Sequence, residues 1–127
     1  MVDPSLLPGE ALQGTLETTA SGLQIAVQSE GTGATASGGQ TVSVHYSGYL
    51  LDGTLFDSSQ TSGQPIEFML GFGQVIDGWD EGLEGMTVGE KRKLVVPPAL
   101  AYGESGFPPV IPANSILVFD VELMEVK

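Results

Sequence analysis

Residues 76–86 read IDGWDEGLEGM and form the only good helix candidate of this 127-residue chain. Ile76, Trp79, Leu83 and Met86 recur at helical spacing, so one face of the helix would be apolar. Acidic residues in the first turn suit the positive end of the helix dipole. The glycines in this stretch lower its helix propensity. We therefore expect packing against a sheet to hold the helix.

Strands are predicted on both sides of this helix. Apolar and polar residues alternate along several segments, and Asp52-Gly53 between two of them is a strong hairpin signal. Strands with one short helix and no βαβ alternation favour an α+β fold with an antiparallel sheet. We expect this sheet to wrap its apolar face around the Trp79 helix. The predicted strand segments are 23–28, 42–47, 55–58, 65–70, 91–96 and 116–126.

Length and composition exclude several classes of protein. A chain of 127 residues is long enough for one domain with a real core. No apolar run approaches the roughly 20 residues of a membrane helix, so a soluble protein is expected. Cysteine is absent, which excludes disulfides, thiolate metal sites and cysteine nucleophiles. The first residues do not resemble a signal peptide, which favours the cytoplasm; a periplasmic or other exported location stays open if a signal was trimmed.

The net charge of −12 is unevenly distributed. The first ninety residues contain twelve acids and no base, and the basic residues are Lys91, Arg92, Lys93 and Lys127. Nucleic acid is therefore excluded as a partner, because phosphate binding needs clustered Lys and Arg. The triplet at 91–93 is interpreted as a solvated strand edge that nearby acids neutralise.

Hydrolytic and metal chemistry find little support. His45 is the only histidine, no Gly-x-Ser-x-Gly elbow is present, and Val44 and Tyr46 would point to the opposite strand face from His45. A structural His45 is expected. The acids between 77 and 84 fit neither a calcium loop nor a zinc site, so they are interpreted as a solvated helix face. No metal or cofactor is predicted.

A set of ordered motifs spans most of the chain, from about Thr18 to Lys127, and resembles the FKBP-type peptidyl-prolyl isomerases. This immunophilin family binds tacrolimus and rapamycin. The resemblance implies a five-stranded, twisted antiparallel sheet around one short α-helix, in a single domain at 20–127 after a flexible N-terminal arm at 1–19, and a monomer. The motifs are VHY at 44–46, DGTLFDSS at 52–59, FMLG at 68–71, QVIDGWDEG at 74–82, AYG at 101–103 and IPANSILVFDVEL at 111–123.

The resemblance also implies a site. Trp79 would form the floor on which a proline ring sits. The backbone N–H of Ile76 and the hydroxyl of Tyr102 would bond ligand carbonyls, with Asp57 beside the twisting amide, and these three are the catalytic candidates. The substrate-binding candidates are Tyr46, Phe56, Phe68, Val75, Trp79, Phe107, Ile111 and Phe119.

The chemistry needs no nucleophile. An Xaa-Pro amide rotates over a barrier of about 18–20 kcal/mol, through a twisted state that is less polar than the planar one. An apolar cavity destabilises the planar state more, so it should lower the barrier. The expected partners are proline-containing peptides and unfolded or folding proteins, together with tacrolimus and rapamycin. Two alternatives stay open: a module that binds proline segments without turnover or serves as a scaffold, and a holdase chaperone.

Two departures from the family concern the rim of the cavity. Gly106-Phe107-Pro108-Pro109 replaces a more usual Gly-His-Pro-Gly, so Phe107 presents an aromatic edge where many relatives have histidine. Ile66 stands where an aromatic residue is common. These changes bear on substrate preference and on the affinity for large macrolides.

Overall fold

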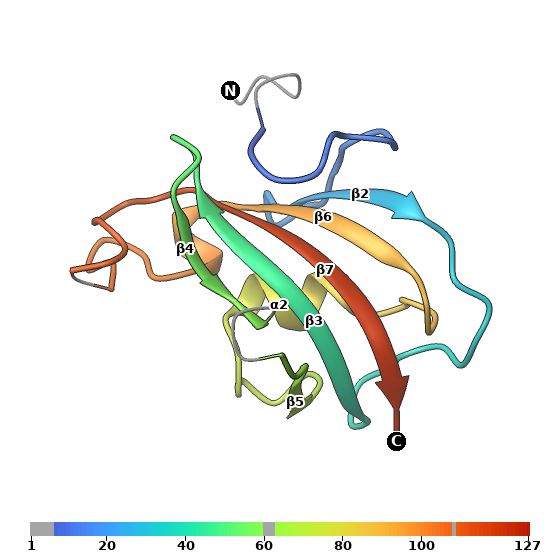
Figure 1. The fold of residues 1–127 in the computed structure, drawn as a ribbon. Coiled ribbons are helices and arrows are strands. Elements are labelled where there is room, and N and C mark those ends of the chain that lie inside the picture. Colours follow the sequence, from blue (N-terminus) through green and yellow to red (C-terminus); the bar gives the residue numbers. More distant parts are fainter. Residues whose placement is uncertain (1–6, 60–62, 108) are drawn as a thin grey trace.

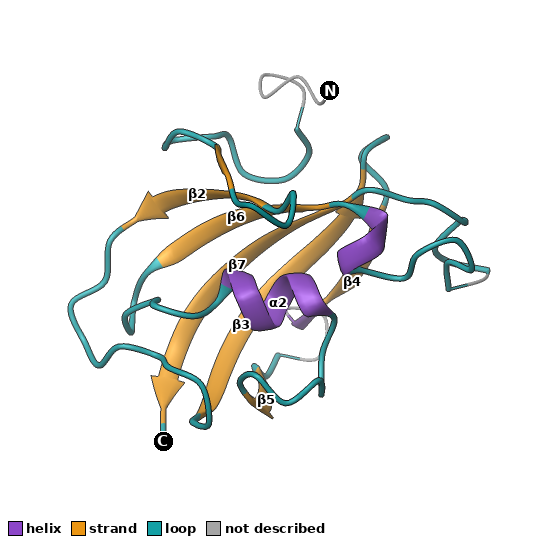
Figure 2. Cartoon of the chain, turned by 180° about the vertical axis from the view of Figure 1, so that it is seen from behind, coloured by secondary structure: helices purple, strands orange, loops and turns teal. Residues whose placement is uncertain are grey.

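The computed structural model describes residues 7–59, 63–107 and 109–127. Within them one antiparallel sheet has the strand order β1-β2-β6-β7-β3-β4, and β5 also pairs with β3. The short helix α2 lies across one face of this sheet (Figures 1 and 2). The elements are β1 (Glu17–Thr18), β2 (Gln24–Ser29), β3 (Thr41–Leu50), β4 (Leu55–Ser58), β5 (Ile66–Met69), α2 (Asp77–Gly82), β6 (Lys91–Val96), the 3-10 helix η2 (Pro98–Leu100) and β7 (Leu117–Val126).

The α+β class and the antiparallel sheet around one short helix are confirmed, but the expected number of five strands is wrong. The described residues form seven strands. One reason is that β3 is ten residues long and its outer edge is shared, because β5 pairs with residues 41–44 and β4 with residues 47–49. The other is β1, a two-residue strand that adds to the edge of β2.

The core lies between α2 and the inner face of the sheet. Alternate residues of β7 are buried there, as the sequence pattern predicted, and β3 and β6 contribute their own inward residues. Inward-facing side chains recur every second residue because successive side chains of a strand point to opposite faces. The buried residues of these three strands in the core are Val42, Val44, Leu94, Val96, Leu117, Phe119, Val121 and Leu123.

Helix α2 is shorter than the 76–86 stretch suggested, and it lies very close to the sheet. A Cβ atom added to Gly78 would lie 2.6 Å from Val96 Cγ1, and one added to Gly82 would lie 2.9 Å from the methyl groups of Leu94. The glycines that weaken the helix locally are therefore what lets it approach β6. None of the helices in the described part of the chain is long and apolar enough to cross a membrane.

The position of residues 91–93 in the sheet contradicts their interpretation as a solvated edge. Strand β6 lies inside the sheet between β2 and β7, and Lys93 is fully buried. Its ammonium group is 2.7 Å from Asp120 Oδ1 and donates to the carbonyl of Pro8 at 2.8 Å. Neutralisation by acids was predicted correctly, but burial depends on strand order, which the local sequence does not show.

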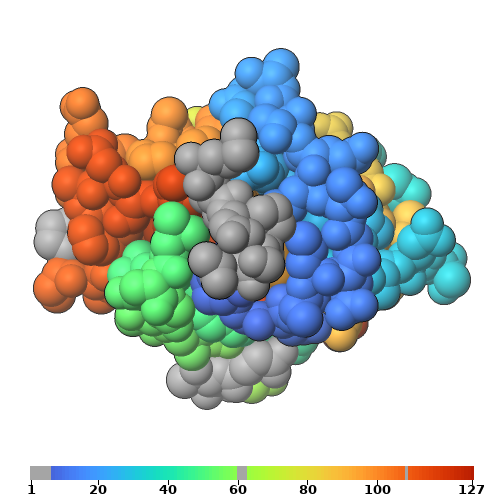
Figure 3. Space-filling model, turned by 90° about the horizontal axis from the view of Figure 1, so that it is seen from above, coloured from blue at the N-terminus to red at the C-terminus, as the bar shows by residue number. Residues whose placement is uncertain are grey.

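The N-terminal segment from residue 7 runs over this outer face, where it appears in blue beside the green β3–β4 region (Figure 3). Gln28 holds it by accepting from the backbone N–H of Gln13 at 2.7 Å and donating to the carbonyl of Ala11 at 2.9 Å. The backbone N–H of Glu10 donates to Asp120. Residues 1–6 of the predicted arm lie outside the described residues, and the flexibility of the arm stays a prediction.

Candidate active site

The floor of the candidate site is Trp79, in the first turn of α2. Its side chain is 4% exposed and packs edge-on against Tyr46 and Phe119, with ring centroids 4.9 and 5.3 Å apart. Phe68 supports it from β5 at 5.8 Å. Edge-to-face packing at these distances is favourable for aromatic rings. The indole is therefore fixed by rings from three strands.

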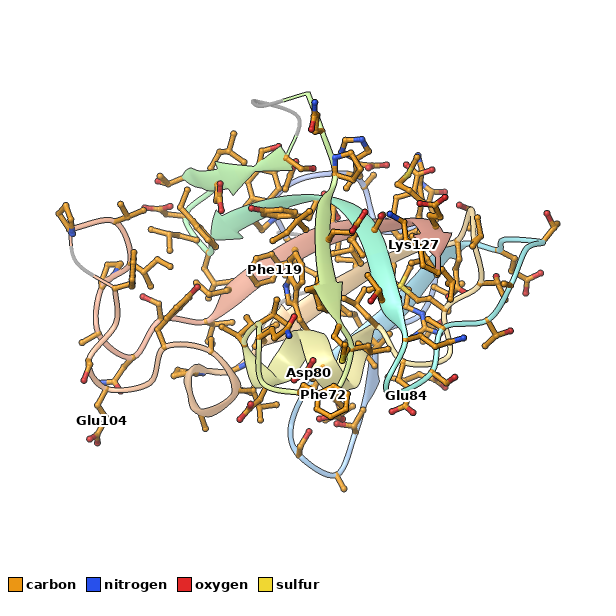
Figure 4. The ribbon with its side chains drawn as sticks, turned by 90° about the horizontal axis from the view of Figure 1, so that it is seen from below. Phe72, Asp80, Glu84, Glu104, Phe119 and Lys127 are labelled. Atoms are coloured by element: carbon orange, nitrogen blue, oxygen red, sulfur yellow. The ribbon has the colours of Figure 1, made fainter. Side chains whose placement is uncertain are left out.

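A cavity of about 220 Å³ opens above this floor. Figure 4 looks at the molecule from below and labels Phe119 on β7. The lining residues are Tyr46, Phe56, Asp57, Ile66, Gln74, Val75, Ile76, Trp79, Tyr102 and Phe119.

The structure brings most of the sequence-predicted site residues to this cavity, but not three of them. Phe68 and Ile111 are buried in the core, and Phe107 lies outside the cavity, 59% exposed, with its ring 5.5 Å from that of Tyr102. Sequence reasoning missed Gln74, although its place directly before Val75-Ile76 could have indicated it.

Asp57 is an exposed carboxylate at the mouth of the cavity. It accepts a hydrogen bond of 2.6 Å from the Tyr46 hydroxyl and one of 2.9 Å from the Ser58 backbone N–H. Burial, followed by the hydrogen bond and the negative charge of Asp57, raises the pKa of Tyr46 above its ordinary 10.0. Burial and the same charge raise the pKa of Tyr102. Both phenols therefore stay protonated and able to donate at neutral pH.

Besides the buried Trp79 indole N–H, two further donors of residues that line the cavity have no partner in the described part of the protein. Within residues 7–59, 63–107 and 109–127, neither the backbone N–H of Ile76 nor the hydroxyl of Tyr102 donates to any acceptor. The carbonyl of Ile76 is used by the first turn of α2, accepting from the backbone N–H of Trp79 at 2.9 Å. These donors can therefore bind ligand carbonyls.

The loop that supplies Val75 and Ile76 is held by Asp80. Its carboxylate accepts from the backbone N–H groups of Gly71 at 2.8 Å and Gly73 at 3.0 Å, and both glycines have positive φ. Asp80 and Phe72, at the tip of this loop, are labelled in Figure 4. Asp80 belongs to the acidic helix face predicted from the sequence, and the structure adds that its half-buried carboxylate is bonded to the loop.

The other side of the mouth is a tight loop that holds Tyr102 and Phe107. The backbone N–H groups of Phe107 and Ile111 donate to each other's carbonyls at 2.8 and 2.9 Å. Gly106 has φ +65°, and a Cβ atom there would lie 2.5 Å from the Ile111 carbonyl oxygen. The side chain of Ile111 packs in the hydrophobic core. Pro108 of the predicted motif lies outside the described residues.

The side chains of His45 and Asp57 lie apart and have different partners. His45 points to the outer face, where its Nδ1 is 2.8 Å from the Ser59 hydroxyl, while Asp57 pairs with Tyr46. Among the described residues no three His, Asp or Glu side chains come together as metal ligands. What the site offers is an apolar cavity with donors at its edge.

Comparison with known proteins identifies the family. The sequence profile described as FKBP-type peptidyl-prolyl cis-trans isomerase matches residues 32–124. Peptidyl-prolyl cis-trans isomerase FPR2 of Saccharomyces cerevisiae is 62% identical over 90 residues, which are 70% of this chain and 67% of the yeast protein. FK506-binding protein 1A of Neurospora crassa is 53% identical over 107 residues, which are 84% of this chain and 89% of that protein.

The fold agrees with this result. The crystal structure of AtFKBP13 matches with a TM-score of 0.83 at 39% identity, covering 89% of this chain and 99% of that one. Several other curated relatives are longer, and the match spans 55% to 64% of their length. Sequence, fold and cavity together show that this chain belongs to the FKBP-type peptidyl-prolyl cis-trans isomerases.

Proposed function

We propose that the cavity above Trp79 is where this chain accelerates cis-trans rotation about Xaa-Pro bonds. The observation that supports this most directly is the pairing of an aromatic cavity with two unpartnered donors, the Ile76 N–H and the Tyr102 hydroxyl. The proline ring packs on the indole, and the donors bind the carbonyls on either side of the rotating bond. Residues Asp57 and Tyr46 form the polar edge.

The rate enhancement comes from surroundings that favour the twisted amide. Water stabilises the planar amide, which is the more polar form, and the aromatic walls replace that water. The fixed donors hold the peptide in a bent shape part-way along the rotation. Each 1.36 kcal/mol removed from the barrier of about 18–20 kcal/mol raises the rate about tenfold.

The substrates follow from the same geometry: proline-containing peptides and proteins that are still folding. Relatives bear the name FK506-binding protein, and we infer that tacrolimus and rapamycin enter this cavity as well. Ile66 and the exposed Phe107 form part of the rim that a large macrolide would touch.

The test is the cis-to-trans relaxation of a short Xaa-Pro peptide with and without the protein, repeated with rapamycin. Acceleration that rapamycin abolishes is expected. Binding of the peptide without acceleration would instead make the chain a proline-segment binding module. A folded protein that neither binds nor accelerates the peptide would contradict the site altogether.

A further inference from the structure

The outer face of the sheet has a small apolar cluster of its own. Ala26, Val95 and Val118 are 0%, 3% and 0% exposed, yet they do not belong to the core beneath α2. Val95 and Val118 lie directly opposite each other on β6 and β7, and Ala26 lies opposite Lys93. Since side chains alternate along a strand, Val95 is on the same face as Lys93. The cluster is therefore buried on the side of the sheet away from the helix, where a second layer must cover it.

That layer is the N-terminal segment of residues 7–14, which we call the strap. It crosses the sheet on the side opposite α2 (Figure 1). Its apolar side chains Leu7, Pro8 and Leu12 are half-buried. Apolar groups that cover an apolar surface remove it from water, which is favourable. The strap therefore buries the outer cluster much as α2 buries the core.

The strap is attached to side chains of the sheet and not to its main chain. In the described part of the chain, the backbone of the strap is hydrogen-bonded to the sheet only through the side chains of Lys93, Asp120 and Gln28. Gln28 alone makes three of these bonds, at 2.7, 2.9 and 3.3 Å. Neighbouring strands, by contrast, are joined by bonds between their main chains. The strap therefore lies on the sheet as a bound peptide does, and it can leave without opening a strand pair.

Two glycines fit the strap to this surface. Gly9 has φ +84°, and a Cβ atom there would clash with Asp120 Oδ2 and lie 2.8 Å from Cε1 of the Tyr49 ring. A Cβ atom at Gly14 would clash with the backbone carbonyl oxygen of Val27. Glycine is the residue that allows both the positive φ and so close an approach. The surface therefore selects a peptide by sequence as well as by shape.

We propose that the outer face of the sheet is a second peptide-binding surface, separate from the cavity above Trp79, and that its ligand is the chain's own strap, which leaves and rebinds as a unit. The ligand class is an extended peptide with Pro-Gly near one end and a second glycine five residues after the first. Lys93 binds a backbone carbonyl of this peptide and Asp120 a backbone N–H. Release of the strap uncovers an apolar patch around this ion pair.

The test measures the binding of a fluorescent peptide of residues 7–16, LPGEALQGTL, to full-length chains by anisotropy. In the double variant Gly9→Ala with Gly14→Ala the chain's own strap no longer fits, while the surface of the sheet is unchanged. The peptide should bind this variant at least about tenfold more tightly than the wild-type chain, whose tethered strap competes at an effective concentration of about 1 mM. A peptide that carries the same Gly9→Ala change should not bind.

Two controls separate this surface from the cavity and from backbone strain. The peptide contains Pro8, so its binding is repeated with saturating rapamycin, which should leave it unchanged because the cavity is on the other face. Gly39→Ala is the matched variant, since Gly39 also has positive φ, +90°, but no atom lies within 4 Å of its added Cβ. This variant should bind the peptide as poorly as the wild-type chain. Hydrogen exchange of residues 7–14 should be faster in the double variant and unchanged in Gly39→Ala.

Binding to the double variant that persists with rapamycin would support the second surface. No binding to this variant, with a cooperative urea unfolding curve as proof that it folds, would overturn the proposal. Binding that rapamycin abolishes would assign the peptide to the cavity and overturn it as well. If the double variant does not fold, Gly9→Ala alone provides the same comparison, because its added Cβ clashes with Asp120.

Discussion

Tyr46 and Asp57 act as one unit at the edge of the site. The sequence predicted both as cavity residues, but only the structure shows the 2.6 Å hydrogen bond between them. That bond orients the carboxylate, and the second phenol, Tyr102, stays unpartnered for a ligand. Tyr46 therefore positions Asp57, whereas the hydroxyl of Tyr102 is available to a ligand, although the two tyrosines look alike in the sequence.

The variants Tyr102→Phe and Asp57→Asn should each slow isomerisation several-fold. Tyr102→Phe loses a hydrogen bond to the substrate, and Asp57→Asn loses the negative charge beside the rotating amide. A net 1 kcal/mol corresponds to about fivefold in rate. Both side chains are exposed, so the urea midpoint should change little. The check is kcat/KM beside a urea unfolding curve; an unchanged kcat/KM would remove these residues from the site.

The raised pKa values of Tyr46 and Tyr102 predict that the folded protein loses stability as the pH rises above about 10. A phenol whose pKa is raised on folding contributes stability that is complete below its unfolded pKa, near 10.0, and is lost as the pH rises through the folded pKa. Phenolate absorbance, compared with Tyr46→Phe and Tyr102→Phe, should show both groups titrating above pH 10.0. Titration of either at or below 10.0 would contradict the geometry of the site.

At the scale of elements, the site is where β3, β4 and β7 meet α2. Gly48 in β3 lies opposite Asp57 on one neighbouring strand and Phe119 on the other. The rings of Phe56 and Phe119 close over it, with centroids 5.7 Å apart. A position without a side chain in the middle of a strand therefore makes room for two cavity walls.

The variant Gly48→Ala should displace two of the aromatic rings that line the cavity. Its Cβ atom would lie 2.7 Å from the Phe56 ring and 2.8 Å from the Phe119 ring, so both rings must move. We expect a loss of about 1–3 kcal/mol in the free energy of unfolding, together with a lower kcat/KM.

Gly38→Ala is the control, because no atom lies within 4 Å of its added Cβ and its φ is not positive. The free energy of unfolding in urea and kcat/KM are measured for both variants. Equal values for Gly48→Ala and Gly38→Ala would contradict this prediction, because they would show that the two rings move without loss of stability or activity.

For the molecule as a whole, the main feature of the outer face of the sheet is the ion pair between Lys93 and Asp120. Lys93 and Asp120 lie directly opposite each other on β6 and β7, and Asp120 also accepts from the Glu10 backbone N–H at 2.9 Å. The pair thus joins two central strands to the N-terminal segment. Phe119, the neighbour of Asp120 on β7, faces the cavity.

The variant Asp120→Asn should be strongly destabilising, because it leaves the Lys93 ammonium buried without its counter-charge. Breaking a buried pair in this way costs about 3–5 kcal/mol. Replacing both partners, as Lys93→Met with Asp120→Leu, should cost much less. The exposed Lys127 provides the control, since Lys127→Met should hardly move the urea midpoint. A double variant that unfolds as easily as Asp120→Asn would contradict this account of the pair.

Strand patterns located the elements closely. The predicted segments 55–58 and 91–96 match β4 and β6, because alternation and the Asp52-Gly53 turn act over a few residues. The family motifs placed Trp79 and most of the cavity walls in advance. Local pattern could not show that β4 and β5 share one edge of β3, since that depends on pairing between distant segments.

By itself, the sequence determined the α+β class and the helix around Trp79, because these follow from short-range periodicity. Its contiguous motifs resemble one family, and that resemblance indicated most of the residues that line the aromatic cavity. Only the tertiary structure decided that Lys93 is buried, that Tyr46 pairs with Asp57 and that Asp80 holds the loop before Ile76. Each depends on which strands become neighbours and in which register. Burial and hydrogen bonding are properties of that arrangement, so the same charged residue is solvated at an edge and enclosed at the centre of a sheet.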